Sequence, residues 1–121
     1  MSKRYRLQTS PFVVPTTDGK LIEEYHGVPS TGDDGLSVAH MIAPAGWTEP
    51  AQVPDFDEYT LMVAGRVRVV VDGESFELRP GATLLVHRGA TVRYSNPYDE
   101  PAEYWSVCVP AFSPDRAHRQ E

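Results

Sequence analysis

The alternation of apolar and polar positions predicts a chain built from short strands. Over residues 66–71, Val67, Val69 and Val71 alternate with Arg66, Arg68 and Val70, which is the period of two of a strand with one face in water. Other β-rich runs cover residues 20–25, 37–43, 58–63, 75–78, 83–86, 91–95 and 103–109. No convincing helical period accompanies them, so the pattern predicts an all-β chain.

Prolines and glycines separate these runs, with 11 prolines and 9 glycines spread along the whole chain. Asp72-Gly73 is a strong hairpin signal, because both residues tolerate the positive φ angles of a primed turn. Pro80-Gly81 predicts a second turn, and one proline and two glycines predict a loop over residues 28–36. This spacing predicts an antiparallel sandwich or barrel, without separating a jelly roll from its relatives.

The length of 121 residues predicts one domain, which we divide into three segments. Residues 1–36 are expected to form an N-terminal arm with edge strands, residues 37–112 the barrel, and residues 113–121 a polar tail. The arm carries an apolar patch, Phe12 to Val14, that needs a surface to bury against. Because an exposed edge strand invites pairing with another chain, we expect a homodimer.

Charge and composition narrow the range of partners. The net charge is −6, and the short basic run of Lys3, Arg4 and Arg6 is too little for a nucleic-acid surface. No apolar run approaches the roughly 20 residues that span a bilayer, and the N-terminus lacks the apolar stretch of a secretory signal. The single cysteine, Cys108, excludes an internal disulfide. We therefore expect a soluble cytoplasmic protein without nucleic-acid or membrane partners.

Two stretches place particular residues at fixed spacings. The first contains Gly46, Gln52, Pro54, Glu58 and Gly65, and the second contains Gly81, His87, Gly89, Val92 and Asn96. This register resembles that of the cupin family, whose motifs read G-x5-H-x-H-x3-4-E-x6-G and G-x5-P-x-G-x2-H-x3-N. The resemblance covers about residues 37–110 and implies the double-stranded β-helix of cupins, an antiparallel jelly-roll barrel.

The resemblance also implies a metal site, from which this chain departs. Metal-dependent cupins hold iron, manganese, nickel or zinc with three imidazoles and a carboxylate. The histidine positions here read Gln52, Pro54 and Val92, which leaves Glu58 as the one good ligand. We therefore expect no metal cofactor. The remaining alternative is a divalent metal in a site rebuilt with His40, Glu49 or His87.

A second feature narrows the resemblance within the family. Asp57-Glu58-Tyr59, followed by a strand and Asp72-Gly73, is similar to the single-domain cupins of the ethanolamine-utilisation type. Those cupins also lack the histidine set. The family as a whole includes enzymes of several classes and pure binding domains, so the resemblance does not decide between them.

Glu58 is the principal candidate for chemistry. The motif register places its carboxylate inside the barrel without the metal that would neutralise it. Burial then raises its pKa, and a carboxyl group tuned in this way can serve as a general base. The competing interpretation is that Glu58 accepts hydrogen bonds from tyrosine or glutamine neighbours and does no chemistry.

Other candidates complete the expected pocket. His40, on the strand before the first motif, would be an acid or base facing Glu58, or else a half-exposed strand residue. We expect the substrate to be bound by Gln52, Tyr94, Tyr104 and Cys108, since strand alternation puts the last two on one face with Ser106. A buried cysteine is more often a small apolar residue than a nucleophile.

These observations support three functions. The first is a small-molecule enzyme of the lyase, isomerase or cyclase type, with Glu58 as general acid or base and no redox metal. The second is a sensor domain that binds a small metabolite without turnover. The third is a metal-dependent cupin with a rebuilt ligand set. The presence or absence of two ionisable groups within reach of each other separates the first function from the second.

Overall fold

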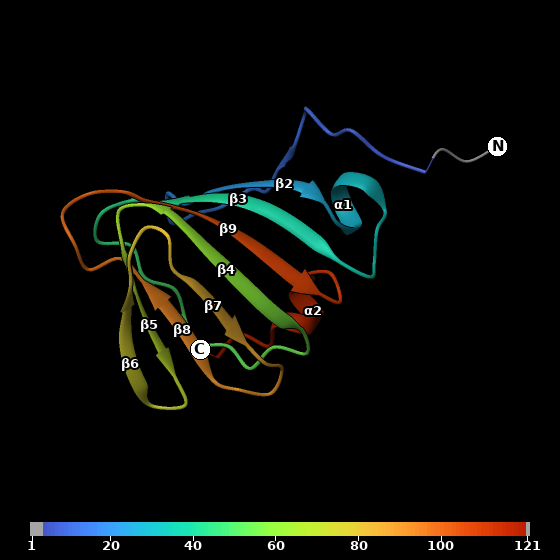
Figure 1. The fold of residues 1–121 in the computed structure, drawn as a ribbon. Coiled ribbons are helices and arrows are strands. Elements are labelled where there is room, and N and C mark those ends of the chain that lie inside the picture. The colour runs from blue at the N-terminus through green and yellow to red at the C-terminus, as the bar shows by residue number, and fades with distance from the viewer. Residues whose placement is uncertain (1–3, 121) are drawn as a thin grey trace.

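The computed structural model describes residues 4–120, which form nine strands and two helical turns (Figure 1). The strands are β1 (Phe12–Val13), β2 (Leu21–His26), β3 (Ser37–Ala43), β4 (Asp57–Ala64), β5 (Val67–Val71), β6 (Glu74–Leu78), β7 (Thr83–Val86), β8 (Val92–Ser95) and β9 (Ala102–Val109). The helical turns are α1 (Val28–Thr31) and α2 (Pro114–Ala117). None of the helices described is long and apolar enough to cross a membrane.

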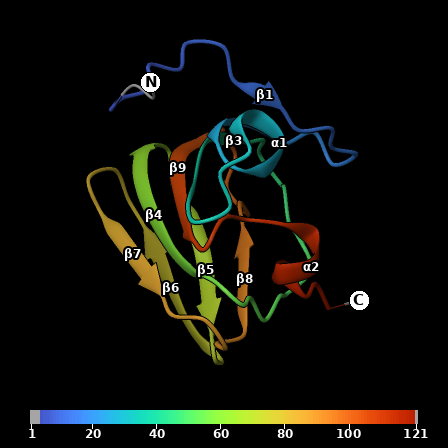
Figure 2. The same ribbon diagram turned by 90° about the vertical axis from the view of Figure 1, so that its right-hand side faces the viewer.

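The strands form two antiparallel sheets, which confirms the jelly-roll prediction. Over the described residues, the larger sheet has the order β1-β2-β3-β9-β4-β7 and the smaller one the order β6-β5-β8. Figure 2 shows α2 and the C-terminal end on the side of the barrel away from β6 and β7. The first two strands extend the same sheet that contains the barrel strands, so the N-terminal segment is continuous with the barrel rather than separate from it.

Two turns fix the register of the central strands. Asp72 and Gly73 adopt φ angles of 49° and 84° and join β5 to β6, as the hairpin signal predicts. Gly65 follows β4 with a φ of 69°, where an added Cβ would meet the carbonyl oxygen of Pro101 at 2.3 Å. A glycine is therefore required at this position both by its backbone conformation and by the close approach of another chain segment.

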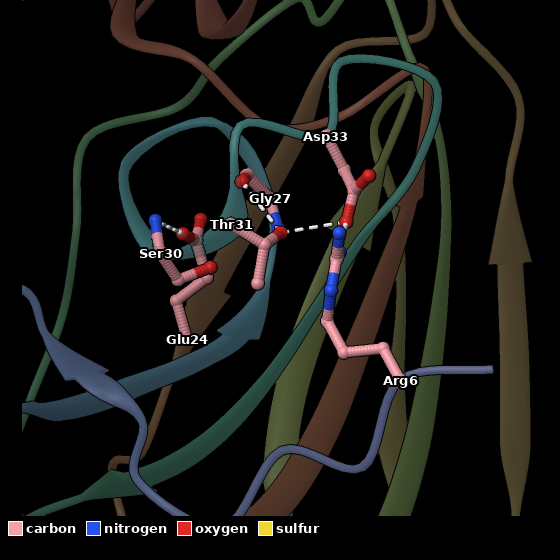
Figure 3. A network of polar contacts seen from close by, with 6 residues as sticks. All are labelled: Arg6, Glu24, Gly27, Ser30, Thr31 and Asp33. Atoms are coloured by element: carbon pink, nitrogen blue, oxygen red, sulfur yellow. Dashed lines mark hydrogen bonds and ion pairs between the residues drawn. The ribbon is translucent and has the colours of Figure 1, made fainter. Parts of the chain in front are cut away.

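The loop predicted over residues 28–36 contains one helical turn, α1. Pro29 near its start is pre-set for helical geometry, and Gly32 ends it in the left-handed region with a φ of 80°. A hydrogen bond of 3.1 Å from Ser30 N to Glu24 Oε2 holds this helical turn against β2 (Figure 3). In the same network, the Thr31 hydroxyl lies 2.6 Å from the Asp33 carboxylate.

The interior of the barrel is filled unevenly. Alternate residues of β9 face inward and are buried, and the outward residues between them are only partly covered. One apolar cluster joins both sheets and includes Met62, Val67, Val69, Val86 and Val92. Apolar side chains do not fill the rest of the interior, which forms the cavity described next. This space is bounded on one side by β2, β3 and β9 and on the other by residues 47–52 and 112–119.

Candidate functional site

A cavity of about 550 Å³ lies against the inner face of the larger sheet, where β2, β3 and β9 meet the segments at residues 47–52 and 112–119. Five of the six residues expected from the sequence line it: Gln52, Glu58, Tyr94, Tyr104 and Cys108. Residues 14–18 form part of its wall, and Phe112, Pro114 and Arg119 of the C-terminal region form another part. The cavity is of the size and mixed polarity usual for small-molecule sites.

Glu58 is held at the cavity wall by one oxygen and leaves the other free. Its Oε2 accepts a hydrogen bond from Ser106 Oγ at 2.5 Å, and the thiol of Cys108 lies 3.8 Å from the same atom. Its Oε1 is buried and has no hydrogen-bond partner in the described chain. Burial raises the pKa of Glu58 above its usual range, although the Ser106 hydrogen bond and the charge of Lys20 oppose that rise.

Gln52 and Glu49 come from the segment that joins β3 to β4. The backbone of Gln52 exchanges two hydrogen bonds with Val92, each of 2.9 Å, and its side-chain Oε1 is buried without a partner within residues 4–120. Glu49 is also buried, and its Oε2 lies 3.8 Å from a guanidinium nitrogen of Arg119. Burial raises the pKa of Glu49, and Lys20 counteracts part of that shift. Two carboxyl groups with raised pKa values therefore border one cavity.

Lys20 is the functional candidate that the sequence interpretation missed. It is buried, with its ammonium 4.2 Å from the centre of the Trp47 ring and 5.1 Å from that of the Tyr104 ring. Burial alone lowers the pKa of Lys20, but the acidic groups of Tyr104, Glu49 and Glu58 outweigh it and raise that pKa. The ammonium therefore stays charged inside the barrel.

The loop that carries Lys20 is anchored to the barrel by Asp18. One carboxylate oxygen accepts a hydrogen bond from Trp47 Nε1 at 2.8 Å, and the other accepts one from Lys20 N at 3.1 Å. Thr16 adds a bond of 2.7 Å from its hydroxyl to the Lys20 carbonyl. Alternation puts Lys20, Ile22 and Glu24 on one face of the strand predicted over residues 20–25. Two charged residues among the three do not by themselves mark that face as the inner one.

The two tyrosines and the cysteine differ in their partners. The hydroxyl of Tyr94 lies 2.9 Å from Thr60 Oγ1, whereas the hydroxyl of Tyr104 is buried and has no partner in the described residues. Burial raises the pKa of both phenols. Burial, with the charge of Glu58, also raises the pKa of the Cys108 thiol, which favours the protonated form over the reactive thiolate.

His40 lies on the opposite face of β3 from the cavity, because Ala39 and Met41 are the residues that face inward. Its Nδ1 lies 2.9 Å from Glu23 and its Nε2 lies 2.7 Å from Glu103. Of the two alternatives for His40, the structure therefore contradicts the acid or base facing Glu58 and agrees with a strand residue outside the cavity. Strand alternation accounts for the difference, since neighbouring residues point to opposite faces.

The residues at the metal-ligand positions of the motif do not suit a transition metal. Pro54 and Val92 are buried but offer no side-chain donor, and Gln52 offers one neutral amide oxygen. The histidines considered for a rebuilt site lie elsewhere, His40 on the outer face and His87 with a side chain 77% exposed. No group of three or more potential ligands is assembled within residues 4–120. The cations near the acidic groups are the buried Lys20 and, beside Glu49, Arg119.

Comparisons with known proteins place this geometry in a family. The sequence profile of the cupin domain matches residues 39–110. A protein of Myxococcus xanthus named endoribonuclease YbeY is 45% identical over 108 residues, which cover 89% of this chain. This chain spans only 37% of that protein's length.

Two solved structures share the fold at low sequence identity. Oxalate decarboxylase from Bacillus subtilis superimposes with a TM-score of 0.74 at 18% identity, over 96% of this chain and 33% of the decarboxylase chain. A putative ethanolamine utilization protein Q from Salmonella typhimurium superimposes with a TM-score of 0.60 at 17% identity, over 77% of this chain and 71% of that one. At these identities the superpositions establish the shared barrel.

Proposed function

The chain belongs to the cupin domain family, and from that premise we propose that it is a small-molecule enzyme of the lyase, isomerase or cyclase type. In this proposal Glu58 moves a proton without a metal ion. The observation that carries it is the state of the Glu58 carboxyl group: Oε2 is fixed by Ser106, and Oε1 is buried without a partner at the cavity wall. The free oxygen is a proton acceptor, and the Tyr94 hydroxyl is near enough to lower the pKa of the carboxyl group.

The environment of Glu58 suits a general base. Its raised pKa increases the basicity of the carboxylate compared with an exposed glutamate, which favours removal of a weakly acidic proton. The Ser106 hydroxyl fixes the direction of the group, so the accepting oxygen keeps one position. The proton would move from a carbon or hydroxyl of the substrate to Oε1, and the same group could return it to another atom.

A second group can balance the charge that develops during this transfer. The unpartnered hydroxyl of Tyr104 is a donor, and the nearby ammonium of Lys20 is a fixed positive charge. Both can stabilise an oxyanion in a cavity of low dielectric constant. This satisfies the requirement for two ionisable groups in one pocket, although the second group is Lys20 rather than His40.

A small molecule suits the cavity better than a nucleic acid as the partner. The chain has a net charge of −6, which disfavours nucleic acid, and three buried polar atoms without partners belong to cavity residues, Gln52, Glu58 and Tyr104. The endoribonuclease named among its relatives extends well beyond the matched region, and we do not propose ribonuclease activity for this chain. The alternative that remains is a binding domain that holds a metabolite without turnover.

Proton transfer can be measured without knowing the natural substrate. Small ketones, oxo acids, hydroxy acids and their esters would be incubated with the protein in D₂O, and loss of the signals of exchangeable C–H groups would be followed by NMR. We expect Glu58→Gln to slow exchange of the responsive compound by about 10²- to 10⁴-fold, the usual contribution of a general base. Dialysis against a chelator should leave the rate unchanged.

The exposed Glu74 of β6 provides a matched control, because Glu74→Gln removes a carboxylate outside the cavity. The control variant should exchange at the wild-type rate. Unchanged exchange in Glu58→Gln would show that the proposed mechanism is wrong. Binding of a compound with no exchange in either protein would favour the binding domain.

A further inference from the structure

The polar groups of the cavity divide into those that have partners and those that do not. Of the acidic residues that line it, Asp18 is bonded to Trp47, Glu24 to the backbone of α1, and Glu49 lies near Arg119. Figure 3 shows the Glu24 carboxylate directed towards Ser30 of α1. These three carboxylates are already engaged by the protein. They therefore help to form the walls of the cavity and are less available to bind a ligand.

Four groups remain free to bind an occupant. Lys20 directs an ammonium to the cavity between two aromatic rings, and it forms no ion pair with any described residue. Gln52 Oε1 and Glu58 Oε1 are buried without a hydrogen-bond partner among the described residues, and the buried hydroxyl of Tyr104 has no partner there besides the adjacent Lys20 ammonium. A buried polar atom without a partner is costly, so these atoms indicate what a ligand must supply.

The four groups are also sorted by chemistry. Lys20 and Tyr104 are donors and lie together, whereas Gln52 Oε1 and Glu58 Oε1 are acceptors. Tyr104 and Ser106, the partner of Glu58, are successive inward positions on β9 and are therefore separated by about 6.6 Å along the strand. All four residues line the same cavity, and the charges of Lys20 and Glu58 affect each other's pKa, so one small molecule can contact both the donors and the acceptors.

We propose that the cavity binds a small carboxylic acid that carries a hydroxyl or amino group, with its carboxylate on Lys20 and Tyr104 and its donor group on Gln52 and Glu58. A carboxylate supplies the acceptors that the ammonium lacks, and the hydroxyl or amine supplies the donor that the two acceptors lack. The Trp47 ring and the apolar wall formed by Ile22 and Met41 leave room for a short carbon chain. This inference rests on the proposed function, because it names the substrate class of the same cavity.

The chain offers a selective probe, because Lys3 and Lys20 are its only two lysines. Lysine labelled with ¹³C at Cε would give two NMR signals, and Lys20→Met identifies the one from the cavity. The panel would contain 3-hydroxybutyrate and serine, the methyl ester or amide of each, butyrate, and propylamine. We expect the hydroxy acid or the amino acid to shift the Lys20 signal and to give a measurable Kd by calorimetry. The esters, the amides, butyrate and propylamine should bind at least about 10-fold more weakly.

Two variants separate recognition from folding. Lys20→Met should weaken acid binding by about 10- to 100-fold, since it removes a charged hydrogen bond to the ligand. Tyr104→Phe keeps the ring that contacts Lys20 and should weaken binding by a smaller factor, so it tests the same end of the cavity if Lys20→Met fails to fold. Arg79→Met removes an exposed cation outside the cavity and should leave the Kd unchanged.

The possible outcomes distinguish this inference from the proposed function. Equal binding of the acids and of their esters or amides, stronger binding of propylamine, or no binding by any compound would overturn the inference. So would unchanged acid binding in both Lys20→Met and Tyr104→Phe. Loss of exchange in Glu58→Gln with acid binding retained would support both proposals. Acid binding without exchange would leave this inference standing while the enzyme proposal fails.

Discussion

The two halves of the barrel interior use the same strands but fill the space differently. Where β5 and β8 cover the larger sheet, Val67, Val69 and Val92 are almost completely buried and pack together with Met62. Where β2, β3 and β9 lie beyond that cover, the inward residues include Lys20 and Ser106, and a cavity remains. The packed half stabilises the fold, and the open half contains the polar groups without partners.

The largest expected effect is on the free energy of unfolding, and it is tested by comparing substitutions of two methionines. Met62 is 5% exposed and belongs to the packed half, so Met62→Ala should reduce the free energy of unfolding by about 2–5 kcal/mol. Met41 borders the existing cavity, so Met41→Ala opens less new empty space and should cost less. Urea denaturation of the two variants measures the difference. Equal losses would show that the two halves contribute equally to stability.

The next effect concerns pH. Burial raises the pKa of Glu58 and Glu49 above the ordinary value of 4.5, so the folded protein holds protons that the unfolded chain releases. The free energy of unfolding should therefore fall as the pH rises from 4.5 through the folded-state pKa values, by at most about 1.4 kcal/mol per pH unit for each proton. Glu58→Gln should reduce this slope in urea denaturations at several pH values. An unchanged slope would contradict the raised pKa of Glu58.

Two titratable groups outside the cavity have net pKa shifts that are set by charged partners rather than by burial, and they provide a reference for the pH dependence of stability. The hydrogen bond from Arg88 lowers the pKa of Asp57, so its stabilising contribution is present above 3.8 and is lost on acidification. Burial lowers the pKa of His40, but Glu103 and Glu23 outweigh it and raise that pKa above 6.5. The His40 contribution is therefore lost as the pH rises through its folded-state pKa, and His40→Gln removes it from the measured slope.

The smallest effect concerns the outer face of the larger sheet. Tyr59, Leu61, Val63 and Leu85 are each about two-fifths exposed on β4 and β7, while Phe12 of β1 is exposed at the edge. We propose that the protein is a homodimer and expect sedimentation at micromolar concentration to give twice the mass of one chain. Leu61→Glu should shift the dimer towards monomer with little effect on ligand binding. A monomeric wild-type protein would contradict the dimer proposal.

The sequence predicted best those features that depend on local spacing. The Asp72-Gly73 hairpin follows from two adjacent residues, and the inward face of β9 follows from alternation. Glu58 was placed in the barrel by its position in a motif, and the structure puts it there. Each of these inferences needs only a few neighbouring residues or a fixed register.

Features that depend on long-range contacts could not be predicted in the same way. Both faces of β3 mix apolar and polar residues, so alternation alone could not decide that Ala39 and Met41, rather than His40, face inward. Lys20 enters the barrel because Asp18 bonds to Trp47, 29 positions further along the chain. Nothing in the local sequence encodes that contact.

The attachment of Lys20 to the loop at residues 14–18 has a consequence for the rates at which a ligand enters and leaves the cavity. Residues 14–18 form a wall of the cavity, and the same loop continues into Lys20. The wall that a ligand must pass and the ammonium that attracts it therefore belong to one segment. If that segment swings outward to admit a molecule, the ammonium travels with it and the interior temporarily loses its attraction for anions. Breaking of the Asp18–Trp47 hydrogen bond would then limit the rates of ligand association and dissociation. Asp18→Asn should increase both rate constants more than it changes their ratio, the Kd.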